Sequence, residues 1–122
     1  MLIFGHPRIE APRFVKISSV QEIANIEAKD IVLFDFDFDL LDYCRQNRIT
    51  CAVKVRNKKE SIYANALDAN YLLCEALDLA MSIQRIANEY IFDVKVIVKI
   101  DERLIETAID AGIDGVYLKN WS

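Results

Sequence analysis

The sequence has little glycine, proline or histidine. Its 122 residues include three glycines and two prolines, and no stretch rich in glycine, proline or serine separates two folded units. A chain of this length commonly forms one domain, so we expect a single domain over residues 1–122. One histidine, His6, cannot build a multi-histidine metal site, and we assign it no function.

Cysteine is also scarce and shows no redox or metal-binding spacing. Cys44, Cys51 and Cys74 are odd in number and form no Cys-x-x-Cys pair. Two of them lie in apolar runs typical of strands, where a thiol behaves as a small hydrophobic group. Because this use of cysteine fits a reducing compartment, we expect a cytoplasmic protein.

The sequence also lacks a cluster of basic residues and a long apolar segment, and both absences limit the partners that we expect. Lysines and arginines are spread singly among acids and the net charge is −4, so the basic stripe of a nucleic-acid-binding protein is missing. The opening stretch MLIFGHPRIE has a short apolar patch with no basic region before it, so it predicts neither a secretion signal nor a membrane span. We therefore expect no nucleic-acid or membrane partner.

The sequence does contain a regular alternation of strand-like and helix-like segments. Short β-branched runs recur about every twenty residues, which is typical of repeated βα units and a parallel sheet. Six strands are predicted, over 13–17, 31–36, 50–55, 71–74, 95–100 and 115–118. The predicted fold is an α/β domain of about six βα units with a mainly parallel sheet.

Helices are predicted between these strands. Ser19, with Glu22 three residues later, forms a capping box that predicts the start of the first helix. Further helices are predicted over 76–90 and 102–111, the second ending at Gly112. Periodicity places Leu79, Ile83, Ile86, Ala87 and Tyr90 on the inward face of 76–90, and Leu104, Ile105, Ala108 and Ile109 on that of 102–111.

One face of the predicted sheet is polar. Its polar residues recur at every second strand position: Lys16, Asp35, Asp37, Lys54, Lys95 and Lys99. This face is either the inside of an incomplete βα barrel or one side of an open sheet that a partner covers. Six units are too few for the usual closure of eight strands. Because an open sheet exposes two edges, we expect a homo-oligomer.

The stretch VLFDFDFDL resembles the first motif of the haloacid-dehalogenase-like phosphohydrolases. The resemblance implies Asp35 as the nucleophile and Asp37 as the residue that handles protons. The chain departs from the motif because Phe38 and Asp39 replace its Gly-Thr, and no later acidic motif completes a magnesium site. In the alternative interpretation, Asp39 caps the next helix, and Asp35 and Asp37 pair with lysines of neighbouring strands, with Lys54 as an expected partner.

A broader resemblance covers more than half of the chain. AVKVRNKKESIYANALDANYLLCEAL and FDVKVIVKIDERLIETAIDAGIDGVYLKN resemble the middle of phosphate-binding βα barrels, in particular indole-3-glycerol-phosphate synthase. The resemblance implies Lys54 as a general acid, or Arg56 or Lys58 in a shifted alignment. Ile97 or a neighbour stands where that family has a glutamate, and the last two units with their glycine-rich phosphate loops are missing, so architecture is implied more than activity.

Candidate site residues follow from the rule that ligands of parallel α/β folds bind beyond the carboxyl ends of strands. The candidate catalytic residues are Asp35, Asp37 and Lys54, and the candidate ligand-binding residues are Glu75, Lys99, Asp101 and Lys119. No metal site is predicted, although the carboxylates carry the oxygen ligands that magnesium prefers. In the alternative interpretation, Asp101 caps one helix and Glu75 begins another.

Three functions are compatible with these residues. The first is a non-catalytic or regulatory domain, a truncated relative of a βα barrel, that acts through self-assembly or a partner. The second is a small enzyme or binding protein for an anionic, phosphorylated metabolite that uses the strand-end acids and lysine. The third is a domain similar to response regulators, with Lys99 as the lysine of the fifth strand.

Overall fold

The computed structural model describes residues 1–119 of the chain. Within these residues the strands are β1 (Leu2–Phe4), β2 (Phe14–Lys16), β3 (Ile31–Asp35), β4 (Cys51–Lys54), β5 (Tyr71–Cys74), β6 (Lys95–Ile100) and β7 (Gly115–Leu118). The α-helices are α1 (Phe38–Gln46), α2 (Lys58–Ala66), α3 (Leu77–Glu89) and α4 (Ile105–Asp110), and the 3-10 helices are η1 (Val20–Asn25) and η2 (Glu102–Leu104).

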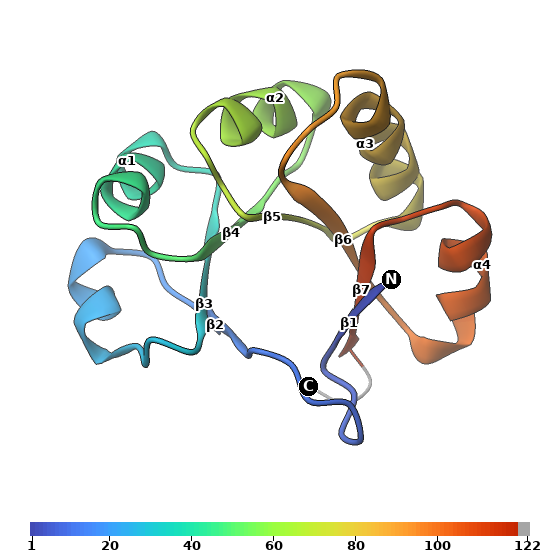
Figure 1. The fold of residues 1–122 in the computed structure, drawn as a ribbon, viewed down its shortest axis with the longest axis horizontal. Helices are drawn as coiled ribbons and strands as arrows, with labels where there is room; N and C mark the ends of the chain where they lie inside the picture. The colour runs from blue at the N-terminus through green and yellow to red at the C-terminus, as the bar shows by residue number, and fades with distance from the viewer. Residues whose placement is uncertain (120–122) are drawn as a thin grey trace.

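The described strands form one parallel sheet in the order β1-β7-β6-β5-β4-β3-β2. The sheet curls around a central axis and carries the helices on its outer side (Figure 1). The predicted α/β fold with an incomplete, barrel-like parallel sheet is therefore confirmed. None of the helices within residues 1–119 has the length and apolar character needed to cross a membrane.

β1 is a strand that the sequence did not predict. It pairs with β7 at one edge of the sheet, whereas β2 forms the other edge. Close packing against β7 requires glycine, because a Cβ at Gly115 would lie 2.8 Å from the Cβ of Leu2 and 2.7 Å from Cδ1 of Ile97. Gly5, directly after β1, has φ of +87°, and a Cβ there would lie 3.1 Å from the carbonyl oxygen of Leu118.

Apolar side chains fill both faces of the sheet. The outer core lies between sheet and helices and includes Phe34, Leu41, Leu72 and Ile83. The inner core lies on the concave face and consists of Phe4, Phe14, Ile31, Leu33, Ala52, Leu73 and Ile97, with Ala11, Tyr71 and Tyr117 packed against it. The prediction of a polar sheet face is therefore wrong for the middle of the sheet and holds at its ends.

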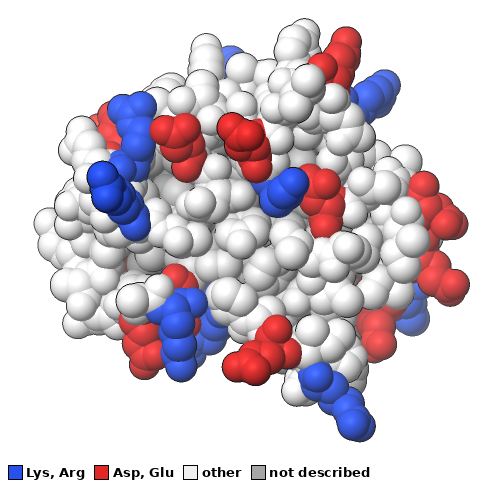
Figure 2. All heavy atoms as spheres, in the orientation of Figure 1, with Lys and Arg blue, Asp and Glu red and all other residues white. Residues whose placement is uncertain are grey.

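The two edge strands meet through side chains. The rings of Phe4 on β1 and Phe14 on β2 lie 4.7 Å apart, and Tyr117 lies 5.0 Å from Phe14 between ring centroids. The segment between β1 and β2 crosses the opening of the curled sheet (Figure 1). In the space-filling view uncharged atoms occupy much of the centre, and acidic and basic side chains are interspersed around it (Figure 2).

Several helix details differ from the predictions. The side chain of Ser19 forms no cap hydrogen bond to η1, although the Glu22 carboxylate accepts a hydrogen bond from the Ser18 amide. Tyr90 is exposed because α3 ends one residue earlier. The helix predicted over 102–111 divides into η2 and α4, which leaves Leu104 and Ile109 exposed. Gly112 has the expected left-handed conformation.

Candidate functional site

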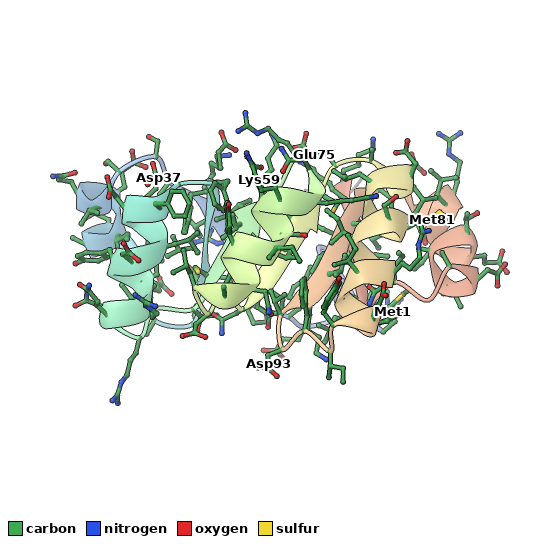
Figure 3. The ribbon with its side chains drawn as sticks, turned by 90° about the horizontal axis from the view of Figure 1, so that it is seen from above. Met1, Asp37, Lys59, Glu75, Met81 and Asp93 are labelled. Carbon is green, nitrogen blue, oxygen red and sulfur yellow. The ribbon has the colours of Figure 1, made fainter. Side chains whose placement is uncertain are left out.

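Six charged residues follow the inner core at the carboxyl end of the sheet. Strand alternation places them on the same concave face as Phe14, Leu33 and Ile97. We call this set the carboxyl-end ring: Lys16, Asp35, Lys54, Glu75, Lys99 and Lys119. Figure 3 shows Asp37, Lys59 and Glu75 at this end of the molecule, and Met1 and Asp93 at the opposite end.

Four members of the carboxyl-end ring form a chain of ion pairs. Asp35 lies beside Lys54 in the register of β3 and β4. Oδ1 of Asp35 lies 2.7 Å from Nζ of Lys16 and 4.0 Å from Nζ of Lys54. Nζ of Lys54 also lies 3.2 Å from Oε1 of Glu75. The predicted pairing of Asp35 with Lys54 is confirmed, whereas the shorter contact, with Lys16, was not predicted.

The electrostatics of Asp35 favour a permanent anion. The hydrogen bond from Lys16 is the main cause that lowers the pKa of Asp35. Burial opposes this shift, and the charges of Lys16, Lys54 and Arg56 add to it. The side chain of Asp35 remains 71% exposed, so water also stabilises the charge. A carboxylate with a lowered pKa is a weak base at neutral pH, which is unfavourable for proton transfer.

Asp37 caps helix α1 and, within residues 1–119, forms no ion pair with a lysine, so its predicted pairing with a lysine of a neighbouring strand is wrong. Its Oδ1 accepts a hydrogen bond of 3.0 Å from the Leu40 amide, and its backbone is extended, as required of an N-cap residue. The prediction that Asp39 is the N-cap is wrong. The N-cap lies two residues earlier, and Asp39 stands in the first turn of α1. The two aspartates of the Asp-x-Asp stretch therefore have different partners.

Asp101 and Glu75 also have local partners. Oδ1 of Asp101 accepts hydrogen bonds from the backbone amide of Arg103 at 2.9 Å and from its Nε at 3.0 Å, which confirms the interpretation of Asp101 as a helix cap. Glu75 precedes α3 and faces Lys54. In the described part of the chain, no three His, Cys, Asp or Glu side chains are arranged to hold a metal ion.

The other side of the carboxyl-end ring is basic. Nζ of Lys99 on β6 lies 5.5 Å from the ring centroid of Tyr117 on β7, a cation-π contact. Lys119 follows β7 at the next inward position and is exposed. The ring thus combines four lysines with two carboxylates, whereas the whole chain has a net charge of −4.

A pocket that the sequence did not indicate lies where β1 meets β2. Its volume is about 400 Å³. Phe4, Phe14 and Tyr117 contribute apolar surface, and His6 and Arg13 contribute polar groups. Nδ1 of His6 accepts a hydrogen bond of 3.1 Å from the Arg8 amide, which orients the imidazole within this segment. The pocket thus depends on the segment between β1 and β2.

Comparison with the models of known protein families and with curated proteins found no match to this chain. The resemblance to indole-3-glycerol-phosphate synthase is therefore not confirmed. The structure supports a coarser statement, that the chain has the parallel sheet and outer helices of an incomplete βα barrel.

Proposed function

We propose that this chain is a non-catalytic domain that acts by assembling with itself or with a partner protein. One observation carries the proposal: the carboxylates of the carboxyl-end ring are neutralised by lysines of the ring itself. Asp35 contacts Lys16 and Lys54, and Glu75 contacts Lys54. A catalytic base or metal site would need at least one carboxylate held in a different electrostatic environment.

The proposal is tested by the melting temperature of the wild type and of Asp35→Asn, each with and without millimolar magnesium. If the ring is structural, magnesium leaves the melting temperature unchanged and Asp35→Asn lowers it slightly, because the variant breaks exposed ion pairs worth below about 1 kcal/mol. Asp110→Asn, at the far end of α4, is the matched control. Stabilisation by magnesium that disappears in Asp35→Asn would instead identify a cation site.

Assembly is tested separately by sedimentation velocity at micromolar concentration. The proposal expects either a dimer or higher oligomer of the pure protein, or a monomer that co-sediments with a partner protein. Turnover of a small substrate that is lost in both Asp35→Asn and Lys54→Met would contradict it.

A second candidate function is the binding of an anionic metabolite, and the basic side of the carboxyl-end ring favours it. Lys99 belongs to β6 and Lys119 directly follows the neighbouring strand β7, so both lie at the carboxyl end of the sheet. We expect pyrophosphate to raise the melting temperature of the wild type but not of Lys99→Gln. Lys95→Gln is the matched control because Lys95 lies on the same face of β6 at its opposite end. An equal response of all three proteins would rule out this site.

A further inference from the structure

Three aromatic rings form a cluster on the outer surface between α1 and α2. Phe36 precedes α1, Phe38 is its first residue and Tyr63 belongs to α2. Ring centroids lie 5.1 Å apart for Phe36 and Phe38, 5.8 Å for Phe38 and Tyr63, and 6.4 Å for Phe36 and Tyr63. We call this cluster the aromatic patch: Phe36, Phe38 and Tyr63.

The aromatic patch extends the outer core to the surface. Phe36 is partly buried against that core, whereas Phe38 is 52% exposed and Tyr63 is 42% exposed. Ile62, the residue before Tyr63, is also exposed. Aromatic side chains that remain in contact with one another while half exposed are typical of the centre of a protein interface.

Opposite charges lie on the two helices that carry the aromatic patch. Asp39 stands in the first turn of α1 and Lys59 in the first turn of α2, and both are exposed. Both helices begin at the carboxyl end of the sheet, where Figure 3 shows Asp37 and Lys59 at the start of neighbouring helices. The acid and the base therefore both lie near the carboxyl end of the sheet, one on each of the two helices that carry the rings.

We infer that the chain forms a two-fold symmetric dimer with a second copy of itself through the aromatic patch. A two-fold axis parallel to α1 and α2 places α1 of each copy against α2 of the other. This arrangement brings Asp39 of one copy to Lys59 of the second, and the same contact occurs again on the other side of the axis. The surface is thus complementary to itself in charge, with rings meeting rings at its centre.

This inference rests on the proposed function and names its partner, because it identifies the surface through which the domain assembles. The first experiment is sedimentation velocity over a range of micromolar concentrations. We expect the wild type to dimerise and Phe38→Glu to be monomeric. A glutamate suits the first turn of a helix, so the variant keeps a favourable helix start.

Ile109→Glu is the matched control for Phe38→Glu. Ile109 is 54% exposed, close to the 52% of Phe38, but lies on α4 outside the aromatic patch. The control should dimerise like the wild type. Circular dichroism melting of each variant separates loss of the interface from loss of the fold.

Charge reversal tests the arrangement of the two copies. Asp39→Lys and Lys59→Glu should each weaken dimerisation at least about tenfold, because each places like charges together at both symmetric contacts. An equimolar mixture of the two variants should recover a heterodimer, since every contact in it again joins an acid and a base. Misfolding of either variant could not produce this recovery.

The outcomes distinguish the inference from the function on which it rests. A wild-type dimer that persists in Phe38→Glu would leave self-assembly standing and overturn the aromatic patch as its interface. A wild type that is monomeric throughout would overturn the dimer, and co-sedimentation of that monomer with a different protein would leave the proposed function standing. Weakening by each charge reversal without recovery in the mixture would overturn the arrangement of α1 against α2.

Discussion

The rings of Phe4 and Phe14 are 4.7 Å apart although their strands form opposite edges of the sheet. Within the described residues, β1 and β2 are joined by no strand pairing, so side-chain packing brings the two edges together. Tyr71 and Tyr117 complete the contact from β5 and β7. The closure of this sheet is therefore an apolar contact rather than a backbone ladder.

Removal of the Phe14 ring should destabilise the protein more than most substitutions would. Phe14 is 8% exposed, and Phe14→Ala should lower the free energy of unfolding by about 3 kcal/mol because it leaves a cavity in the inner core. Urea unfolding measures the change. Tyr90→Ala, at a residue 67% exposed, should change it by about 0.5 kcal/mol or less. If both variants lowered the free energy of unfolding equally, the inner core would contribute little to the stability of the protein.

A methyl group at Gly115 should loosen β1. The Cβ of Gly115→Ala would meet Leu2 and Ile97 within 3 Å, so β1 must shift, at a cost of about 1–3 kcal/mol. We expect faster hydrogen exchange of the Leu2 amide, which donates to the carbonyl oxygen of Asp114. At Gly112 a Cβ would meet no atom within 4 Å but φ is +71°, so Gly112→Ala should lower the overall stability by about 1 kcal/mol without loosening β1. Exchange of the Leu2 amide should therefore rise more in Gly115→Ala than in Gly112→Ala. Unchanged exchange in Gly115→Ala would refute the close contact.

Stability should fall in acid, with Glu60 as a main contributor. The Glu60 side chain is 7% exposed and accepts hydrogen bonds from the amide of Arg56 at 2.9 Å and from its Nη2 at 2.8 Å. The hydrogen bond from the Arg56 side chain is the main cause that lowers the pKa of Glu60 below its ordinary value of 4.5. A lowered folded-state pKa means that the folded state binds fewer protons than the unfolded state.

The contribution of Glu60 is therefore complete above its ordinary pKa and is lost as pH falls through the folded-state pKa. Glu60→Gln should cost about 1–2 kcal/mol at pH 7 and flatten the loss of stability below pH 4.5. Urea midpoints between neutral pH and pH 3 measure both effects. Asp35→Asn should flatten the curve less, because Asp35 is 71% exposed and its ion pairs are screened. If the stability of Glu60→Gln fell with decreasing pH as steeply as that of the wild type, Glu60 would not be a main contributor to the loss of stability in acid.

The cysteines should be unreactive in the folded protein. Cys44, Cys51 and Cys74 are free and buried, and burial raises the pKa of Cys74 to about 12. The pKa of Cys51 is also raised, by its contact with Cys44 and by burial. The hydrogen bond with Cys51 lowers the pKa of Cys44, so this thiol is protected by its burial, with 1% of the residue exposed. A thiol reagent at pH 7.5 should therefore label the protein only as fast as it unfolds. Rapid labelling without urea would contradict the buried positions.

The sequence predicted six of the described strands because their apolar runs are bounded by turn residues. Strands 71–74, 95–100 and 115–118 have the predicted limits. β1 was missed because its three residues carry too little pattern, and its strand conformation depends on pairing with β7 at the other end of the chain. The composition of a short segment cannot reveal a partner so distant in sequence.

The candidate site was predicted in part. Asp35 beside Lys54 followed from the rule that consecutive strands are neighbours, which the register confirms. The position of the N-cap depends on where β3 ends. The predicted strand covers 31–36, whereas β3 ends at Asp35, so the sequence pattern missed the cap at Asp37. Lys16 lies in a strand of three residues, so its contact with Asp35 depends on the exact register with β3.

The pairing of β1 with β7 has a consequence for biosynthesis. Leu2 leaves the ribosome before strands β2 to β6, whereas its partner Gly115 is made after all of them. Until β7 is made, Phe4 has no strand beside it. The segment that joins β1 to β7 contains all the other strands, so this pairing closes a long stretch of chain. β1 should therefore dock only after β7 has formed, so the strand of this sheet that is made earliest takes its place last.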